Sequence, residues 1–199
     1  HNLNFEGAPI FLFELARFLA EQPGVSVTVA SPQDGPLRAR LEQSGLKVEI
    51  WDVAGLTGAK TPAAFAAALQ AFADSRSWAQ CDVLVCNTMV TYWGVHLAAQ
   101  LHKPSALYVH ESNPVKRFFQ PLLPPAMHDT VEAALRLAPR VVFTAQATQQ
   151  IFEELNAGDR FRLLPSWVDF GRIEEFARRH DPAALRRKHG LDPDAVVVV

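Results

Sequence analysis

The stretch DVLVCNTMVTYWGVHLAAQLHKPSALYVH, residues 82–110, decides the fold of this chain. It begins with an apolar run at 82–87, continues with a helical pattern near 91–102, and ends in a second apolar run at 105–110. Runs that are apolar on consecutive residues are typical of strands buried on both sheet faces. Two such strands joined by a helix predict a parallel pair with a crossover helix.

The same alternation continues in both directions from residues 82–110. It predicts a doubly wound α/β fold, in which helices cover both faces of a parallel sheet. The runs VLVC, ALYV and VVFT are expected in central strands, whereas LKVEIW alternates polar and apolar residues and suits an edge strand. The further predicted strands are 25–30, 46–51, 140–144 and 161–166, and the further predicted helices are 9–21, 36–43, 62–74, 124–137 and 145–155.

The two ends of the chain suggest that it is truncated. A polar loop that ends in Glu6-Gly7 leads into the first helix without a preceding strand, and DAVVVV at 194–199 reads as a strand without a partner. Two charged helical stretches come before that last run. We therefore expect an α/β domain at 1–168 that lacks its first strand, a helical connector at 169–191, and the first strand of another domain at 192–199.

Composition excludes several classes of protein. Nineteen Lys and Arg residues against 21 Asp and Glu give a formal charge of −2, which argues against nucleic-acid binding. No apolar run is long enough to cross a membrane, and no signal peptide is visible. Cys81 and Cys86 are too far apart along one strand to form a disulfide, so we expect free thiols in a reducing, cytoplasmic compartment.

Polar residues follow the predicted strands at the positions where an open parallel sheet binds its ligands. They are expected on one rim, although polar turn residues are also common for reasons of solvation alone. No histidine has metal-ligand spacing, and no metal site is predicted. The rim candidates are Gly7, Asn87, Thr88, His110, Glu111, Thr144, Ser166 and Asp169.

Two of these candidates suggest chemistry. Gly7 precedes a predicted helix, where backbone N–H groups and the helix dipole attract anions; the alternative is a glycine that only permits a tight turn. His110 ends an apolar strand, where its imidazole could donate to or accept from a sugar hydroxyl; the alternative is a solvated loop histidine.

Two other segments imitate functional motifs. AGLTGAKTP, residues 54–62, resembles the end of a phosphate-binding P-loop, but alanine stands at 54 and 59, where that motif requires glycine. VKRFFQPLLPP, residues 115–125, combines two cations with apolar residues and could touch a membrane interface. A loop packed against its own domain is the preferred interpretation, because two cations are a weak electrostatic anchor.

Four segments together resemble the N-terminal domain of GT-B fold glycosyltransferases, specifically glycosyltransferase family 4. They are HNLNFEGAPIFLFELARFLAE at 1–21, VLVCNTMVTYWGVHLAAQLHKPSALYVHES at 83–112, VVFTAQATQQIFEEL at 141–155, and FRLLPSWVDFGRI at 161–173. The resemblance implies a Rossmann-like domain that binds the acceptor, with the nucleotide-sugar donor held by a separate C-terminal domain. Transfer with retention of anomeric configuration, and without metal or cofactor, is also implied.

The resemblance also implies roles for individual residues. Gly7, with Ala8, would lie near the donor phosphates, His110 would contact the transferred sugar, and Asp169 would lie at the interdomain hinge. The family pattern before Asp169 usually contains Asn-Gly, but Ser166 and Trp167 stand there instead. The donor-site signature of the family, a basic pair and an E-x7-E element, belongs to the C-terminal domain and is not found in this chain.

The expected function is hexose transfer from a nucleotide sugar to a glycan, lipid or small acceptor. The chain would act together with its own C-terminal domain and would be inactive alone. If the acceptor is a lipid, we expect peripheral contact with the inner face of the membrane. A GT-B-like epimerase and a non-enzymatic Rossmann-like binding module are the alternatives.

Overall fold

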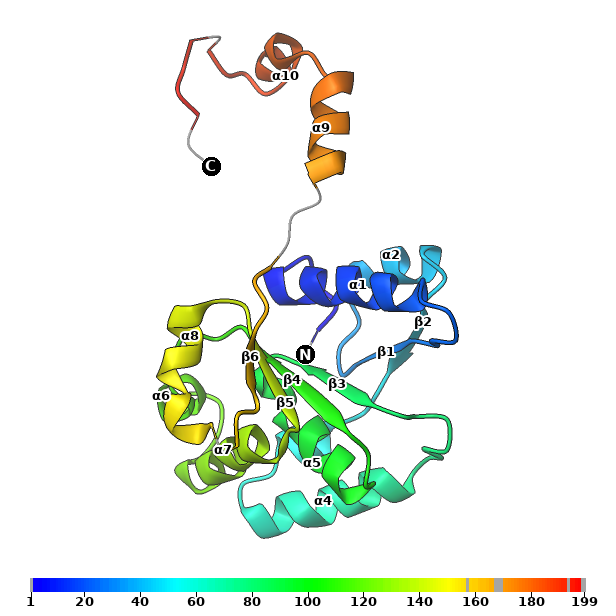
Figure 1. Ribbon diagram of the computed structural model, residues 1–199, viewed down its shortest axis with the longest axis vertical. Coiled ribbons are helices and arrows are strands. Elements are labelled where there is room, and N and C mark those ends of the chain that lie inside the picture. The colour runs from blue at the N-terminus through cyan, green and yellow to red at the C-terminus, as the bar shows by residue number, and fades with distance from the viewer. Residues whose placement is uncertain (1, 157, 167–169, 193, 198–199) are drawn as a thin grey trace. The chain divides into compact units, whose positions relative to one another are not determined.

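The computed structural model describes residues 2–156, 158–166, 170–192 and 194–197 (Figure 1). The chain divides into two compact units, unit 1 at residues 1–165 and unit 2 at residues 166–199. Each unit is described by itself below. The division falls three residues before the expected domain boundary at 168, and Asp169 lies outside the described residues.

The described strands of unit 1 form two sheets in which every pair is parallel. One sheet has the order β1-β2 and the other has the order β3-β4-β5-β6. The strands are β1 (Thr28–Ser31), β2 (Lys47–Ile50), β3 (Leu84–Asn87), β4 (Ser105–Val109), β5 (Arg140–Phe143) and β6 (Phe161–Leu163). The predicted α/β fold with a parallel sheet is confirmed.

Helices lie on both sides of these strands. Figure 1 shows α1 and α2 on one side and α4 and α5 on the other. The helices are α1 (Gly7–Ala20), α2 (Leu37–Gln43), α3 (Ala54–Thr57), α4 (Pro62–Asp74), α5 (Tyr92–Gln100), α6 (Val115–Phe119), α7 (His128–Leu137) and α8 (Gln146–Ile151), with 3-10 turns η1 (Met89–Thr91), η2 (Pro125–Met127) and η3 (Glu153–Leu155).

Two short helices, α3 and α6, were not predicted. They have four and five residues, and a helix of little more than one turn does not display the repeating apolar spacing by which longer helices are identified.

The P-loop interpretation of residues 54–62 fails for a local reason. The Thr61 hydroxyl accepts a hydrogen bond from the Ala64 N–H at 3.2 Å and so caps α4, with Pro62 at the first helical position.

The register of the larger sheet aligns the ends of its strands. Asn87, the last residue of β3, is paired with Tyr108 of β4. Val109, the last residue of β4, is paired with Phe143, which ends β5. The residues that follow these three strands therefore emerge at one edge of the sheet, as the sequence predicted.

The position of β3 differs from the prediction. The strands β4 and β5 are interior and mostly buried, but β3 is an edge strand among the described residues, and Val85 is 38% exposed. Apolar sequence indicates which faces a strand buries against helices, but it does not determine how many neighbours the strand pairs with. The predicted edge position of β2 is confirmed.

Two hydrophobic clusters stabilise unit 1. The larger one joins the β3–β6 sheet to α4, α5 and α7, and the smaller one lies beneath α1 and α2. Fully buried members of the larger cluster include Met89, Leu97, Val109, Val131 and Phe143. Burial of such side chains contributes roughly 1.5–3 kcal/mol each relative to exposure, so this cluster fixes the strands that carry the rim.

Three apolar side chains of residues 115–125 pack against their own domain. Val115, Phe119 and Leu123 are buried, while Leu122 is exposed, as are Lys116 and Arg117. This arrangement supports the preferred interpretation of a packed loop.

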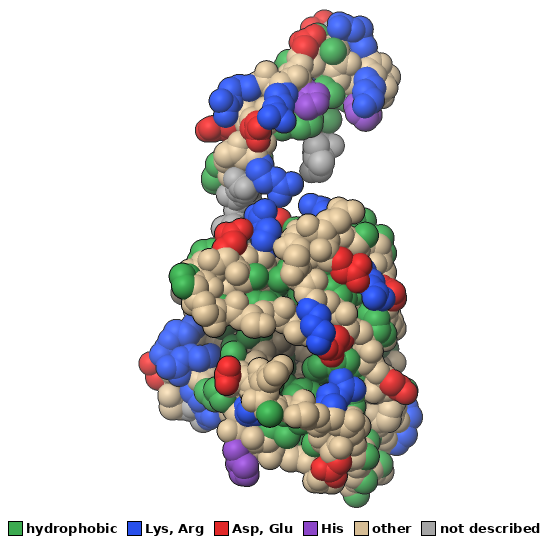
Figure 2. Space-filling model, turned by 90° about the vertical axis from the view of Figure 1, so that its right-hand side faces the viewer, with side chains coloured by type: hydrophobic (Ala, Val, Ile, Leu, Met, Phe, Trp, Pro, Cys, Tyr) green, Lys and Arg blue, Asp and Glu red, His purple; other side chains and the backbone are tan. Residues whose placement is uncertain are grey.

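On the face shown in Figure 2, positive and negative side chains of unit 1 are interspersed. None of the described helices is long and apolar enough to span a membrane.

Unit 2 contains the two predicted connector helices, α9 (Phe170–Arg179) and α10 (Pro182–Lys188). The Asp181 carboxylate accepts hydrogen bonds from the N–H groups of Ala183 and Ala184, each at 3.1 Å, and caps α10. Residues 194–197 do not form the predicted strand. A strand requires a hydrogen-bonded neighbour, and the described residues offer none there.

Candidate functional site

Asn87 is the centre of the candidate site. It ends β3, is only 5% exposed, and uses both ends of its side-chain amide. Its Nδ2 donates to the carbonyl oxygen of Ala8 at 2.9 Å, and its Oδ1 lies 2.8 Å from Nε2 of His110. The amide thus connects the first turn of α1, 79 positions before it in the sequence, to the residue that follows β4.

His110 is half-buried directly after β4. Burial lowers the pKa of its imidazole below the ordinary value of 6.5, which favours the neutral ring at pH 7. The ring of Phe11 meets the imidazole edge to face, with centroids 5.1 Å apart and an interplanar angle of 71°. Hydrogen bond and ring contact together hold the imidazole in one orientation.

Glu111 turns toward the backbone. Its two carboxylate oxygens accept hydrogen bonds from the Met89 N–H at 3.0 and 3.1 Å, and Oε2 also accepts from the His110 N–H at 3.1 Å. Burial raises the pKa of this carboxyl, while the backbone hydrogen bonds act in the opposite direction. Glu111 therefore ties the loop after β3 to the loop after β4.

Thr88, between Asn87 and η1, has a backbone conformation that side chains rarely adopt. Its φ of 79° and ψ of 153° lie in a region used almost only by glycine. Its N–H donates to the Tyr108 carbonyl at 2.8 Å, and its own carbonyl accepts from the Thr91 hydroxyl at 2.8 Å. Such strain costs roughly 1–3 kcal/mol and clusters at functional sites. These bonds maintain the strained turn beside Asn87.

The N-terminus of α1 completes the site. Gly7 is exposed and Ala8 is half-buried, and no hydrogen bond joins the N–H of either residue to another described residue. Unpaired N–H groups in the first turn of a 14-residue helix carry partial positive charge. An added Cβ on Gly7 would have no heavy atom within 4 Å, so the space in front of this residue is open.

The remaining predicted site residues differ in placement. Thr144 directly follows β5 and is half-buried, but among the described residues no hydrogen bond connects it to Asn87 or His110. Ser166 is exposed and belongs to unit 2. Asp169 falls outside the described residues. The structure thus brings together Ala8, Asn87 and His110 directly, with Gly7 and Thr88 as chain neighbours and Glu111 fixing the two loops behind them.

Two features of the site were not among the predicted residues. Phe11 lies in the predicted helix 9–21, and nothing local distinguishes a ring that contacts a rim histidine from one in the core. The Ser112 and Thr148 hydroxyls lie 3.3 Å apart and join the loop after β4 to α8.

Within the described residues, no group of three or more His, Cys, Asp or Glu side chains could hold a metal ion.

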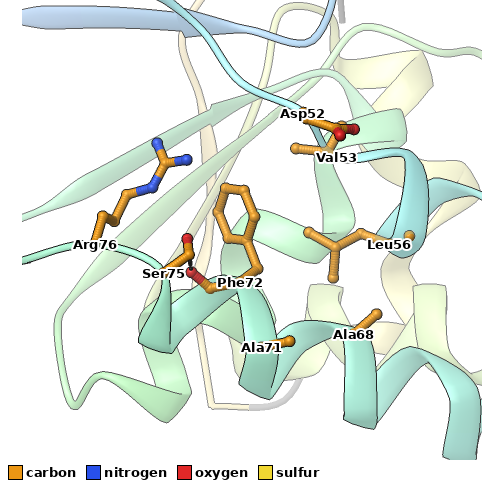
Figure 3. A pocket seen from close by; sticks show the side chains of 9 residues that line it. Asp52, Val53, Leu56, Ala68, Ala71, Phe72, Ser75 and Arg76 are labelled. Atoms are coloured by element: carbon orange, nitrogen blue, oxygen red, sulfur yellow. Dashed lines mark hydrogen bonds between the residues drawn. The ribbon is translucent and has the colours of Figure 1, made fainter.

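A separate hollow of about 430 Å³ lies where the segment after β2 meets α3 and α4 (Figure 3). The Arg76 guanidinium covers aromatic rings at its edge, 4.7 Å from the ring centres of Trp51 and Phe72. None of the predicted site residues lines this hollow. Its lining residues are Asp52, Val53, Gly55, Leu56, Ala68, Ala71, Phe72, Ser75 and Arg76.

Comparison with known proteins gives a family for most of the chain. The sequence model of Glycosyltransferase Family 4 matches residues 5–172, which include every predicted site residue. No curated protein matches the sequence significantly.

Solved structures share the fold. Anabaena HepE in complex with UDP-glucose is similar with a TM-score of 0.64 at 18% identity, over 92% of this chain and 46% of that one. HepE in complex with UDP and glucose gives 0.62 at 20% identity, over 93% and 47% of the two chains. A UDP-N-acetylglucosamine 2-epimerase gives 0.53 at 14%, over 81% and 46%. The chain spans about half the length of these solved chains.

Proposed function

Because the chain belongs to glycosyltransferase family 4, we propose that it is the acceptor-side half of an enzyme that transfers a hexose from a nucleotide sugar to a glycan, lipid or small acceptor. Its partner in this reaction is a C-terminal domain of the same protein, joined through the connector at 169–191, with Asp169 at the hinge. Family membership and the match to about half the length of the HepE chains support this division of labour.

One observation carries the proposal. Through its two hydrogen bonds, the Asn87 side chain joins the open N-terminus of α1 to the His110 imidazole. A nucleotide sugar has a diphosphate beside a hydroxyl-rich ring, and these two chemistries match an anion-attracting helix end next to a neutral imidazole. We assign the diphosphate to the N–H groups of Gly7 and Ala8, and a sugar hydroxyl to His110.

In the proposed reaction the bond between the sugar and the diphosphate breaks, and the acceptor oxygen forms the new glycosidic bond on the same face of the sugar. The proton of the acceptor hydroxyl passes to the departing diphosphate. Configuration is then retained. Negative charge develops on the departing diphosphate, and the amides of Gly7 and Ala8, together with cations of the C-terminal domain, would stabilise it. His110 orients the sugar. The other rim residues, Thr88, Glu111 and Thr144, support or line the cleft. This scheme uses no metal or cofactor from this chain.

The location of the enzyme in the cell depends on its acceptor in this proposal. We place the enzyme in the cytoplasm, and a lipid-linked acceptor would bring it to the inner face of the membrane. The exposed residues of 115–125 include Leu122, Lys116 and Arg117, which could make such a contact. With only two cations, that contact would be weak and peripheral.

The second candidate function is that of a GT-B-like epimerase. The structural similarity to a UDP-N-acetylglucosamine 2-epimerase favours it. An epimerase would also need to hold a nucleotide sugar at the helix end and the rim, so the product of the reaction, rather than binding, separates the two candidates.

The deciding experiment uses the full-length protein that carries this chain. It is incubated with UDP-glucose, other UDP-sugars and GDP-sugars, and released nucleotide and sugar products are measured. Nucleotide release that is lost in His110→Ala supports the transferase, and the anomeric configuration of the product tests retention. An epimerised sugar supports the second candidate. A folded protein that acts on none of these donors would favour a non-enzymatic binding module.

A further inference from the structure

The contacts of Asn87 determine which way its amide faces. The Ala8 carbonyl oxygen can only accept a hydrogen bond, so the group 2.9 Å from it must be the amide NH₂. The other end of the amide, facing the His110 ring, is therefore the oxygen. Because Asn87 is 5% exposed, solvent offers no ready alternative partner for a flipped amide.

The amide orientation in turn determines the tautomer of His110. An amide oxygen only accepts, so the ring nitrogen 2.8 Å away, Nε2, must carry the hydrogen. In a neutral imidazole the other nitrogen, Nδ1, then has a lone pair and no hydrogen. Burial favours the neutral ring, as described above.

The Nδ1 atom of His110 is left available for a ligand. None of the described residues forms a hydrogen bond to it, and the edge-to-face contact with Phe11 restricts rotation of the ring. A ring held at Nε2 and against Phe11 presents a fixed acceptor on its remaining nitrogen.

We propose that Asn87 is a positioning residue that makes His110 a hydrogen-bond acceptor, so that the site selects a sugar carrying a hydroxyl group opposite Nδ1. This inference rests on the proposed function and goes further, because it states the polarity of the contact. A donor sugar whose facing hydroxyl is replaced by hydrogen or fluorine cannot donate to Nδ1 and should be used poorly.

The tautomer is measured directly by NMR of ¹⁵N-histidine-labelled protein at pH 7.5, with His110→Gln to assign the signal. His110 is expected as the Nε2–H tautomer in the wild type and as a mixture in Asn87→Ala. His96 is an internal control, because its Nε2 donates to the Thr130 carbonyl at 2.8 Å and should be unaffected by changes at Asn87. An Nδ1–H tautomer at His110 in the wild type would overturn the proposal.

Activity of the full-length enzyme gives the second readout. Asn87→Ala should lower kcat/KM about tenfold through loss of an oriented hydrogen bond. Asn87→Asp retains an acceptor beside Nε2 but adds negative charge, which raises the pKa of His110. Protonation removes the Nδ1 lone pair, so the acidic limb of the kcat/KM profile should move to higher pH. A merely structural role would lower the rate without moving this limb.

The two parts of the experiment separate two failures. If the wild type has no transfer activity with any donor while the Nε2–H tautomer is observed, the proposed function fails and the structural assignment stands. If the wild type transfers sugar but the profile of Asn87→Asp does not move, the positioning role fails and the function stands. Thermal melting of each variant verifies that it is folded, and Asn87→Ala provides the test if Asn87→Asp does not fold.

Discussion

Gly94 of α5 packs directly against the thiol of Cys86 in β3. A Cβ on Gly94 would lie 2.7 Å from the Cys86 sulfur, closer than real Cβ contacts occur. The absence of a side chain at Gly94 therefore permits α5 to approach the strand that ends in Asn87. This close approach connects packing in the larger core to the geometry of the site.

Gly94→Ala should destabilise the fold by about 1–3 kcal/mol, because the methyl group must displace α5 or the buried sulfur. Urea unfolding measures the change. The double variant Cys86→Ala/Gly94→Ala should cost less than the sum of the two single variants, since removal of the sulfur makes room for the methyl group. Strictly additive costs would show that the two residues do not compete for space.

Gly35→Ala should also destabilise the protein, by a comparable ~1–3 kcal/mol. A Cβ there would lie 2.5 Å from the Leu3 carbonyl oxygen, which is held in place by a 2.8 Å hydrogen bond from the Leu37 N–H. Gly55→Ala is the matched control, because its Cβ would only touch the Ala68 methyl at an ordinary 3.6 Å. Equal loss of stability in both variants would contradict this account.

Gly7→Ala separates stability from function. No heavy atom lies within 4 Å of the added Cβ, and Gly7 begins α1, so stability should remain the same or rise by up to about 1 kcal/mol. In the full-length protein the KM for the nucleotide sugar should rise, because the methyl group would occupy the approach of the diphosphate. An unchanged KM would remove Gly7 from the proposed donor contact.

Stability should fall as the pH is lowered from about 7.5 to 5.5. Burial lowers the pKa values of His96 and His110 below 6.5 in the folded protein. In this range the unfolded chain binds more protons than the folded chain, so acid favours unfolding. Urea titrations at each pH should show a smaller slope for His96→Gln. The raised pKa of Glu111 acts in the opposite sense and cancels in this comparison, since both proteins contain it.

The two free thiols should differ in reactivity. Burial raises the pKa of Cys86 to about 12, whereas Cys81 is only partly buried and has a pKa raised to a lesser extent. At pH 8 a thiol reagent should modify Cys81 slowly in the native protein and Cys86 only after unfolding. Cys81→Ser should therefore show no native reaction. Rapid native labelling of Cys86 would contradict its buried placement.

The sequence by itself determined the alternation of strands and helices and the list of rim residues. Apolar runs and helical spacing are local properties, and in a parallel sheet they also imply which strand ends share an edge. The N-caps Thr61 and Asp181 are local features as well, since a capping side chain bonds to N–H groups two or three positions away.

Only the tertiary structure decided how those rim residues meet. Asn87 bonds to Ala8 and His110, Glu111 turns toward the backbone of Met89, and the Phe11 ring meets the imidazole. Ala8 and Asn87 alone lie 79 positions apart in the sequence, and no local pattern specifies contacts between residues so distant. Their distances depend on how the larger core brings β3, β4 and α1 together, because side-chain hydrogen bonds require atoms within about 3 Å and fixed directions.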